Sequence, residues 1–189
     1  MAIFYKGSGI GTYWHKCDAR SSGLVAKSPR VTSKTDRLME HIARGNIASP
    51  YVSLTRSFGV AENYALHGRG KVRKKNPAFV YELEVPEDSR DNFQLIDPVR
   101  QIVLSSPEPP YQQAYHHDGD QRFLVGVVSA DHREFLKHSV RLAPGSTAVP
   151  RTPNLSKELE TLALALRDSE ILAVGTIAPK YILNRYDIT

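Results

Sequence analysis

The spacing of apolar residues predicts several short β-strands. Residues 78–85 (AFVYELEV) place four large apolar side chains on one face and both glutamates on the other, and a period of two is typical of a half-buried strand. Residues 3–5 and 51–55 are short runs rich in aromatic or β-branched residues, which favour strands. Weaker patterns predict extended segments at residues 12–15, 93–96, 101–104, 123–128 and 171–174.

Apolar residues at helical spacing predict three helices. Two of them cover residues 36–43 and 60–66, and each is followed by a glycine that ends it. Ser33 is a weak capping position for the first. The third runs from a cap at Ser156 to Arg167, and its inward positions are Leu159, Leu162, Ala163 and Leu166. Strands outnumber helices and do not alternate strictly with them, so the sequence predicts an α+β fold.

Two polar stretches suggest how the chain is divided. Residues 105–122 are predicted to form a long loop, and ordered loops of this length are often functional. Residues 143–153 are rich in Pro, Ser and Thr and are predicted to be a linker. We therefore expect a main domain over residues 1–142 and, over residues 143–189, a linker with a C-terminal helix and strand that pack on the same domain. A length of 189 residues fits one compact domain.

The net charge of the chain is concentrated in one segment. The sequence has 25 Lys and Arg against 20 Asp and Glu, and residues 69–75 (RGKVRKK) contain five basic residues and no acidic one, so 25 − 5 = 20 basic residues balance the 20 acidic ones elsewhere. These five are Arg69, Lys71, Arg73, Lys74 and Lys75. They predict either a solvated loop or a patch that attracts nucleic acid in a salt-dependent way.

Other sequence features exclude several classes of protein. A single cysteine, Cys17, excludes an internal disulfide and a multi-cysteine zinc site, and no pattern places a histidine beside it as in a catalytic dyad. The cluster of His116, His117, Asp118 and Asp120 lies in one loop without the usual spacing of metal ligands, so we expect no metal. The glycine-rich residues 7–11 lack the GK[ST] of a P-loop. No run approaches the roughly 18 apolar residues of a membrane span, so we expect a cytoplasmic protein.

Three polar segments stand next to predicted strands and suggest a family. They are residues 13–20 around His15, residues 53–56 (SLTR) with Tyr64 on the next predicted helix, and residues 116–122 before the apolar run at 123–128. In this order they resemble the motifs of the mono-ADP-ribosyltransferase superfamily, which includes bacterial toxins. The resemblance covers residues 3–129 and implies a split mixed or antiparallel β-sheet with flanking helices that binds NAD.

The resemblance also implies roles for individual residues on the NAD-binding side. His15 matches the first motif, which bonds the adenosine ribose or a nearby phosphate. Ser53 and Thr55 match the strand that supports the nicotinamide pocket, and Arg56 is expected to reach the pyrophosphate. Tyr64 matches the aromatic ring that stacks on nicotinamide, and we count it with the catalytic residues.

The third motif of the family supplies the catalytic carboxylate. Family members usually place a Glu directly before an apolar strand, where it polarises the ribose 2′-hydroxyl and stabilises the positive charge that develops as nicotinamide leaves. In this chain Arg122 directly precedes the apolar run, after Asp120 and Gln121. Gln121 matches better by position and Asp120 by charge, so both are candidates.

The function implied by the resemblance is transfer of ADP-ribose from NAD, as co-substrate, to a macromolecule. Nucleic acid is slightly favoured over protein as the acceptor because of the basic residues at 69–75. Such an enzyme resembles the toxin of a toxin–antitoxin or phage-defence system, or an effector, and implies an antitoxin or immunity protein as partner. Two alternatives remain open: a catalytically silent NAD-fold or nucleic-acid-binding module, and an NAD glycohydrolase with water as acceptor.

Overall fold

A computed structural model describes residues 1–45, 48–86, 93–105, 112–117, 120–125 and 157–189. The strands are β1 (Ala2–Ser8), β2 (Leu24–Val25), β3 (Tyr51–Thr55), β4 (Ala78–Val85), β5 (Phe93–Ile96), β6 (Gln112–His117), β7 (Asp120–Val125), β8 (Glu170–Ile177) and β9 (Ile182–Ile188). The helices are α1 (Tyr13–Lys16), α2 (Ala19–Ser22), α3 (Thr35–Arg44), α4 (Phe58–Leu66), α5 (Pro98–Ser105) and α7 (Lys157–Arg167), with a 3₁₀ turn η1 (Pro179–Tyr181).

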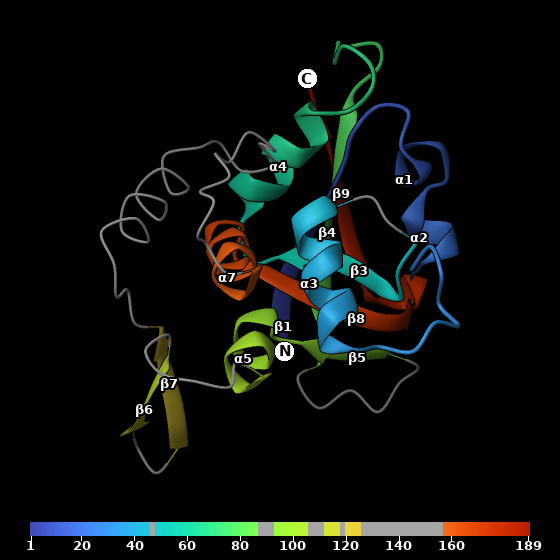
Figure 1. The fold of residues 1–189 in the computed structure, drawn as a ribbon. Coiled ribbons are helices and arrows are strands. Elements are labelled where there is room, and N and C mark those ends of the chain that lie inside the picture. The colour runs from blue at the N-terminus through green and yellow to red at the C-terminus, as the bar shows by residue number, and fades with distance from the viewer. Residues whose placement is uncertain (46–47, 87–92, 106–111, 118–119, 126–156) are drawn as a thin grey trace.

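The strands form a curled antiparallel sheet in the order β2-β8-β3-β1-β4-β9, and β5 pairs with β8 (Figure 1). Strands β6 and β7 form a separate two-stranded sheet. Helices and an antiparallel sheet together confirm the predicted α+β class. The domain boundary predicted at residues 142–143 and the linker at 143–153 lie outside the described residues. Beyond them, β8 and β9 pair with β3 and β4 in the same sheet.

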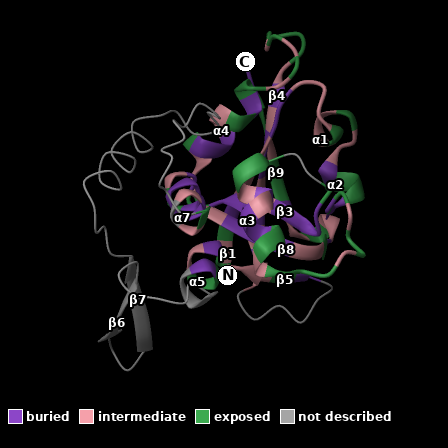
Figure 2. Cartoon of the chain, in the orientation of Figure 1, coloured by how far each residue is buried: buried purple, intermediate pink, exposed green. Residues whose placement is uncertain are grey.

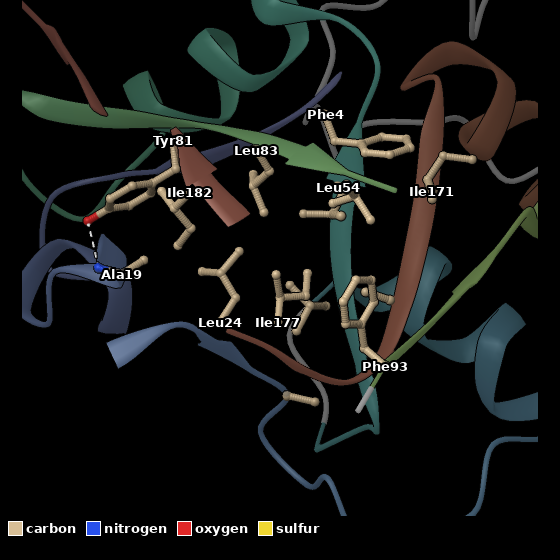
Figure 3. Close-up of a cluster of buried hydrophobic side chains, with 14 residues drawn as sticks. Phe4, Ala19, Leu24, Leu54, Tyr81, Leu83, Phe93, Ile171, Ile177 and Ile182 are labelled. Carbon is tan, nitrogen blue, oxygen red and sulfur yellow. Dashed lines mark hydrogen bonds between the residues drawn. The ribbon is translucent and has the colours of Figure 1, made fainter. Parts of the chain in front are cut away.

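One face of the sheet carries the largest apolar cluster. In this cluster, side chains of β1, β3, β4 and β8 pack with Leu24 of β2, Phe93 of β5 and Ile182 of β9 (Figure 3). The buried Tyr81 hydroxyl donates to the Trp14 carbonyl (2.8 Å) and accepts from the Ala19 amide (3.4 Å). This tyrosine therefore anchors the segment of α1 and α2 to β4 without leaving a buried polar group unpaired.

Helices cover the opposite face. Leu38 and Met39 of α3, Ile102 of α5 and Leu162 of α7 pack on Tyr51 of β3 and on Leu172 of β8. Figure 2 shows the buried residues concentrated in the sheet and on the sides of the helices that face it. Helix α4 packs through its alanines on β4. The alternation in β4 is confirmed: Tyr81 and its neighbours two residues apart enter the first cluster, whereas Val80 faces α4.

Glycines allow close contacts between α4 and the N-terminal segment. A Cβ atom on Gly7 would lie 2.1 Å from the Ala61 carbonyl oxygen of α4, and one on Gly68 would lie 2.3 Å from the Ile10 amide nitrogen. Such distances admit no side chain. The glycine-rich residues 7–11 therefore bring β1 directly against α4 and the chain that follows α4.

Most predicted elements are confirmed. The bounds of β3, β4 and β5 are those predicted, β1 and β8 extend their predicted runs, and α3, α4 and α7 cover the predicted helices. Gly45 ends α3 in the left-handed region (φ 63°). The predicted cap at Ser33 is wrong, because α3 begins after Lys34 and the Ser33 hydroxyl bonds that of Tyr51 (2.8 Å). Leu166 is 54% exposed rather than inward.

Three other predictions are wrong. Of residues 12–15 only Thr12 is extended, and residues 13–15 lie in the short helix α1. Residues 101–104 lie in α5, which starts at Pro98 and whose Arg100 amide donates to the Asp97 carboxylate (3.2 Å). A proline in the first turn and an aspartate before it are helix-start signals. The predicted loop at 105–122 contains β6 and the start of β7.

Candidate functional site

A chain of hydrogen-bonded polar side chains lies where α3 covers β3 and β8. His41 of α3 is buried, its Nδ1 lies 2.6 Å from Ser49 Oγ, and its Nε2 lies 2.8 Å from Ser53 Oγ. Ser53 also forms a side-chain hydrogen bond with Glu170 at the start of β8. When Glu170 is ionised it only accepts, so Ser53 donates to Glu170, His41 Nε2–H donates to Ser53, and Ser49 donates to His41 Nδ1.

Burial shifts the pKa values of His41 and Glu170, two titratable groups of this hydrogen-bonded network, in opposite directions. Desolvation, aided by Lys6 and Lys27, lowers the pKa of His41 to about 4, so the imidazole is neutral near pH 7. Desolvation raises the pKa of Glu170 to about 7; Asp168 adds to the rise, and Ser53, Lys6 and Arg167 oppose it. Burial also lowers the pKa of Lys6, which Glu170 opposes. A carboxyl group that titrates near neutral pH is typical of catalytic sites.

Tyr64, in α4, lies beside this hydrogen-bonded network. Its side chain is 42% exposed, yet its hydroxyl donates to Asp168 Oδ2 at 2.5 Å. Asp168 is held in turn by a buried ion pair with Arg167 (2.7 Å). Burial and the negative charge of Asp168 raise the pKa of Tyr64, which therefore keeps its proton. The result is an aromatic ring that is open to solvent and fixed in orientation.

The turn between α7 and β8 positions both acidic residues. The Thr55 hydroxyl donates to the Asp168 carbonyl (2.6 Å), and the Arg56 amide donates to the Ser169 carbonyl (3.2 Å). Ser169 adopts a positive φ of 46°. Glu170 then pairs with Thr55 of the neighbouring strand β3. Its side chain therefore lies on the same face of the sheet as that of Ser53, which is two residues before Thr55.

The sheet is narrowly joined at this point. Strands β1 and β3 share one registered pair, Tyr5 with Thr55, whereas β1 and β4 share seven. Lys6 directly follows Tyr5 and interacts electrostatically with Glu170 and His41. The polar residues of β1, β3 and β8 therefore gather where β3 and β1 are joined by a single registered pair. We call Lys6, His41, Ser53, Tyr64, Asp168 and Glu170 the junction cluster.

The structure brings some of the predicted residues together and places others elsewhere. Ser53 and Tyr64 belong to the junction cluster, and Thr55 bonds to it. His15 lies in α1, where its Nε2 is 3.0 Å from the Pro77 carbonyl and its ring stacks on Phe79. None of these described contacts of His15 is with the junction cluster. Arg56 is exposed, with its guanidinium over the Phe4 ring (5.2 Å).

The predicted third-motif residues lie in β7. Asp120 and Gln121 pair there with His117 and His116 of β6. Their side chains lie outside what the structure describes, so their assignment stays a prediction.

Sequence reasoning missed four members of the junction cluster. Glu170 directly precedes a predicted apolar strand, the position that the resemblance assigns to the catalytic Glu. Lys6 is a cation near the end of the first strand, where the resemblance implies an Arg or a His. The sequence signal for Asp168 was weaker and consisted only of its position two residues before Glu170. His41 had no signal, because its burial depends on how α3 packs.

Neither a protein-family model nor a curated protein matches this sequence. Among the described residues, no three or more His, Cys, Asp or Glu side chains are grouped so that they could hold a metal ion. Cys17 is a half-buried free thiol. In the same part of the chain, no helix is long and apolar enough to cross a membrane. The junction cluster is therefore the basis for assigning a function.

Proposed function

We propose that the chain is an NAD-dependent mono-ADP-ribosyltransferase in which Glu170 is the catalytic carboxylate. The observation that carries the proposal is the position of Glu170 at the start of β8, bonded to Ser53 of the neighbouring Ser-x-Thr strand. The resembling family has a carboxylate directly before an apolar strand. Asp120 and Gln121 remain the competing assignment for this role.

The other members of the junction cluster support roles in binding NAD. The exposed ring of Tyr64 is suited to stacking on nicotinamide, and its hydroxyl bond to Asp168 keeps the ring in place. Ser53 orients the Glu170 carboxylate. Lys6 supplies positive charge for a phosphate of NAD, a role that the resemblance assigned to His15 or Arg56, and a lysine does so as a point charge.

The chemistry asked of Glu170 is electrostatic. The bond between the nicotinamide nitrogen and ribose C1′ breaks, nicotinamide leaves with the bonding electrons, and a nucleophile of the acceptor attacks C1′. The ionised carboxylate stabilises the positive charge that develops on the ribose. Loss of one comparable electrostatic group, a hydrogen-bond donor of an oxyanion hole, lowers the rate of other enzymes by about 10²- to 10³-fold. Since the pKa of Glu170 is about 7, the ionised form increases as the pH rises through that value.

The test is incubation with NAD labelled in its ADP-ribose part, with separate protein, DNA and RNA acceptors. Glu170→Gln is expected to lower the rate of nicotinamide release by at least about 100-fold. Glu84→Gln is the matched control, because Glu84 is also a half-buried strand glutamate, on β4 opposite Ile3. Equal rates for wild type and Glu170→Gln would refute the role of Glu170.

The alternatives are separate outcomes of the same assay. Free ADP-ribose without labelled macromolecule indicates an NAD glycohydrolase. No nicotinamide release indicates a silent NAD-fold or nucleic-acid-binding module. If the protein is a toxin, expression of the wild-type chain arrests cell growth and expression of Tyr64→Ala does not.

A further inference from the structure

The basic loop, residues 69–75, is a shaped surface rather than an extended tether. It lines, with Asn76, a concavity of about 590 Å³ whose walls are Lys71, Arg73, Lys74 and Lys75. Arg73 and Asn76 exchange two backbone hydrogen bonds (3.2 and 2.8 Å), so Lys74 and Lys75 form the tip of a tight turn. The loop leaves the end of α4 and projects beyond it (Figure 1).

The base of the basic loop is fixed to the N-terminal segment. The Arg69 amide donates to the Ile10 carbonyl (2.8 Å), and Val72 packs with Ile10 on the small apolar cluster under α4. A Cβ atom on Gly70 would lie 2.7 Å from the Ile10 side chain. These contacts hold the cations in place, so fewer backbone conformations are lost when a ligand binds.

The charges of the basic loop are available to a partner. All five cationic side chains are exposed, and within the described residues none of them is in an ion pair. The segment contains no acidic residue. Four closely spaced cations around a concave surface without carboxylates, with Arg69 next to them in the sequence, match a ligand with regularly repeated negative charge.

We propose that the basic loop binds the phosphate backbone of a nucleic-acid strand and presents that strand as the acceptor of ADP-ribose. The naming of the acceptor rests on the proposed function, but the binding does not. The loop starts at Arg69, three residues after the end of α4 and five residues after Tyr64, so a nucleic-acid strand held there is bound next to the end of α4 that carries the ring assigned to nicotinamide. Contacts to phosphates carry no base specificity, so sequence-independent binding is expected.

The salt dependence of binding gives the magnitude. Each phosphate contact contributes about 0.7 to the slope of log affinity against log salt for a single strand. If all five cations contact phosphates, the affinity falls by roughly 100-fold between about 50 and 200 mM salt. With only Arg69 left, the fall is about 3-fold over the same range.

The experiment measures fluorescence anisotropy of labelled single-stranded RNA, single-stranded DNA and duplex DNA, without NAD. The test variant replaces Lys71, Arg73, Lys74 and Lys75 by Gln. The matched control replaces four exposed cations elsewhere, Lys16, Arg30, Lys34 and Arg37, by Gln. A third variant, with Lys71, Lys74 and Lys75 changed to Arg, keeps the charge. We expect the test variant alone to lose the steep salt dependence.

Three results would overturn the proposal: no salt-sensitive binding by the wild type, an equal loss in the matched control, or equally tight binding of polyglutamate. Nicotinamide release is measured in parallel for every variant. Binding that persists while no variant or wild type releases nicotinamide would reject the proposed enzyme and leave the binding surface in place. Nicotinamide release that depends on Glu170, without any binding of nucleic acid, would support the proposed enzyme and reject the binding surface.

Discussion

The sharpest prediction from the junction cluster concerns how stability depends on pH. His41 is normally protonated below about pH 6.5 but has a folded pKa of about 4, so the unfolded chain binds its proton more readily. Stability contributed by neutral His41 is therefore present above pH 6.5 and is lost as the pH falls toward 4. Glu170 behaves oppositely: its pKa rises from 4.5 to about 7, so the folded state gains stability as the pH falls through 7 toward 4.5.

The two effects have nearly equal size. One pKa unit corresponds to about 1.4 kcal/mol, so each shift is worth about 3 kcal/mol over its full range. Between about pH 7.5 and pH 5, His41 costs roughly 2 kcal/mol of unfolding free energy and Glu170 returns roughly the same amount. In the wild type they offset each other. Replacing one of the two groups should therefore reveal the pH dependence that the other contributes.

The perturbations are His41→Gln and Glu170→Gln, with His67→Gln as control because His67 is exposed at the end of α4. Urea unfolding at about pH 7.5 and pH 5 gives the free energies. Relative to wild type, His41→Gln should become about 2 kcal/mol more stable over that fall in pH, and Glu170→Gln about 2 kcal/mol less stable. A pH dependence of His41→Gln equal to that of wild type would refute the reasoning, whatever its stability at pH 7.5.

Four further predictions concern the site and the packing that supports it. Under the proposed function, nicotinamide release by the wild type should increase as the pH rises through about 7, and a rate that is flat from about pH 6 to pH 8 would contradict the role of Glu170. Tyr64→Phe keeps the ring but loses the bond to Asp168, so it should raise KM for NAD less than Tyr64→Ala does in steady-state assays. Gly7→Ala should destabilise the fold by about 1–3 kcal/mol in thermal unfolding, because its Cβ meets the Ala61 carbonyl. Gly59→Ala in α4, whose Cβ would meet only the Oγ of the N-cap residue Ser57 at 3.9 Å, should stabilise the fold by about 0.5 kcal/mol.

The sequence predicts elements well where a full period is present. β4 has eight residues of alternating pattern, and its bounds are those predicted. A segment of four residues is too short to separate a period of two from one of 3.6. Accordingly, the strand prediction is confirmed at 93–96 and wrong at 12–15 and 101–104. Residues 101–104 belong to α5, and the proline at its start, Pro98, indicates a helix more clearly than the apolar residues do.

The residues of the candidate site also fall into those that the sequence could predict and those that it could not. Ser53, Thr55 and Tyr64 are separated by at most eleven positions, so one strand and the next helix were enough to place them together. Glu170 reaches Ser53 only because β8 pairs with β3 more than a hundred residues away, and pairing partners are not encoded in a local pattern. The antiparallel register then fixes Glu170 opposite Thr55.

The choice of residue at position 170 argues for function rather than stability. Glu170 shares its face of β8 with Leu172 and Val174, which pack under the helices. An apolar side chain at 170 would continue that pattern, whereas an ionised glutamate there costs about 3 kcal/mol above pH 7. His41 and Lys6 add further groups whose charged forms burial disfavours. Proteins concentrate such departures from stable packing where they need them chemically, and in the described part of this chain they meet at the junction of β1, β3 and β8.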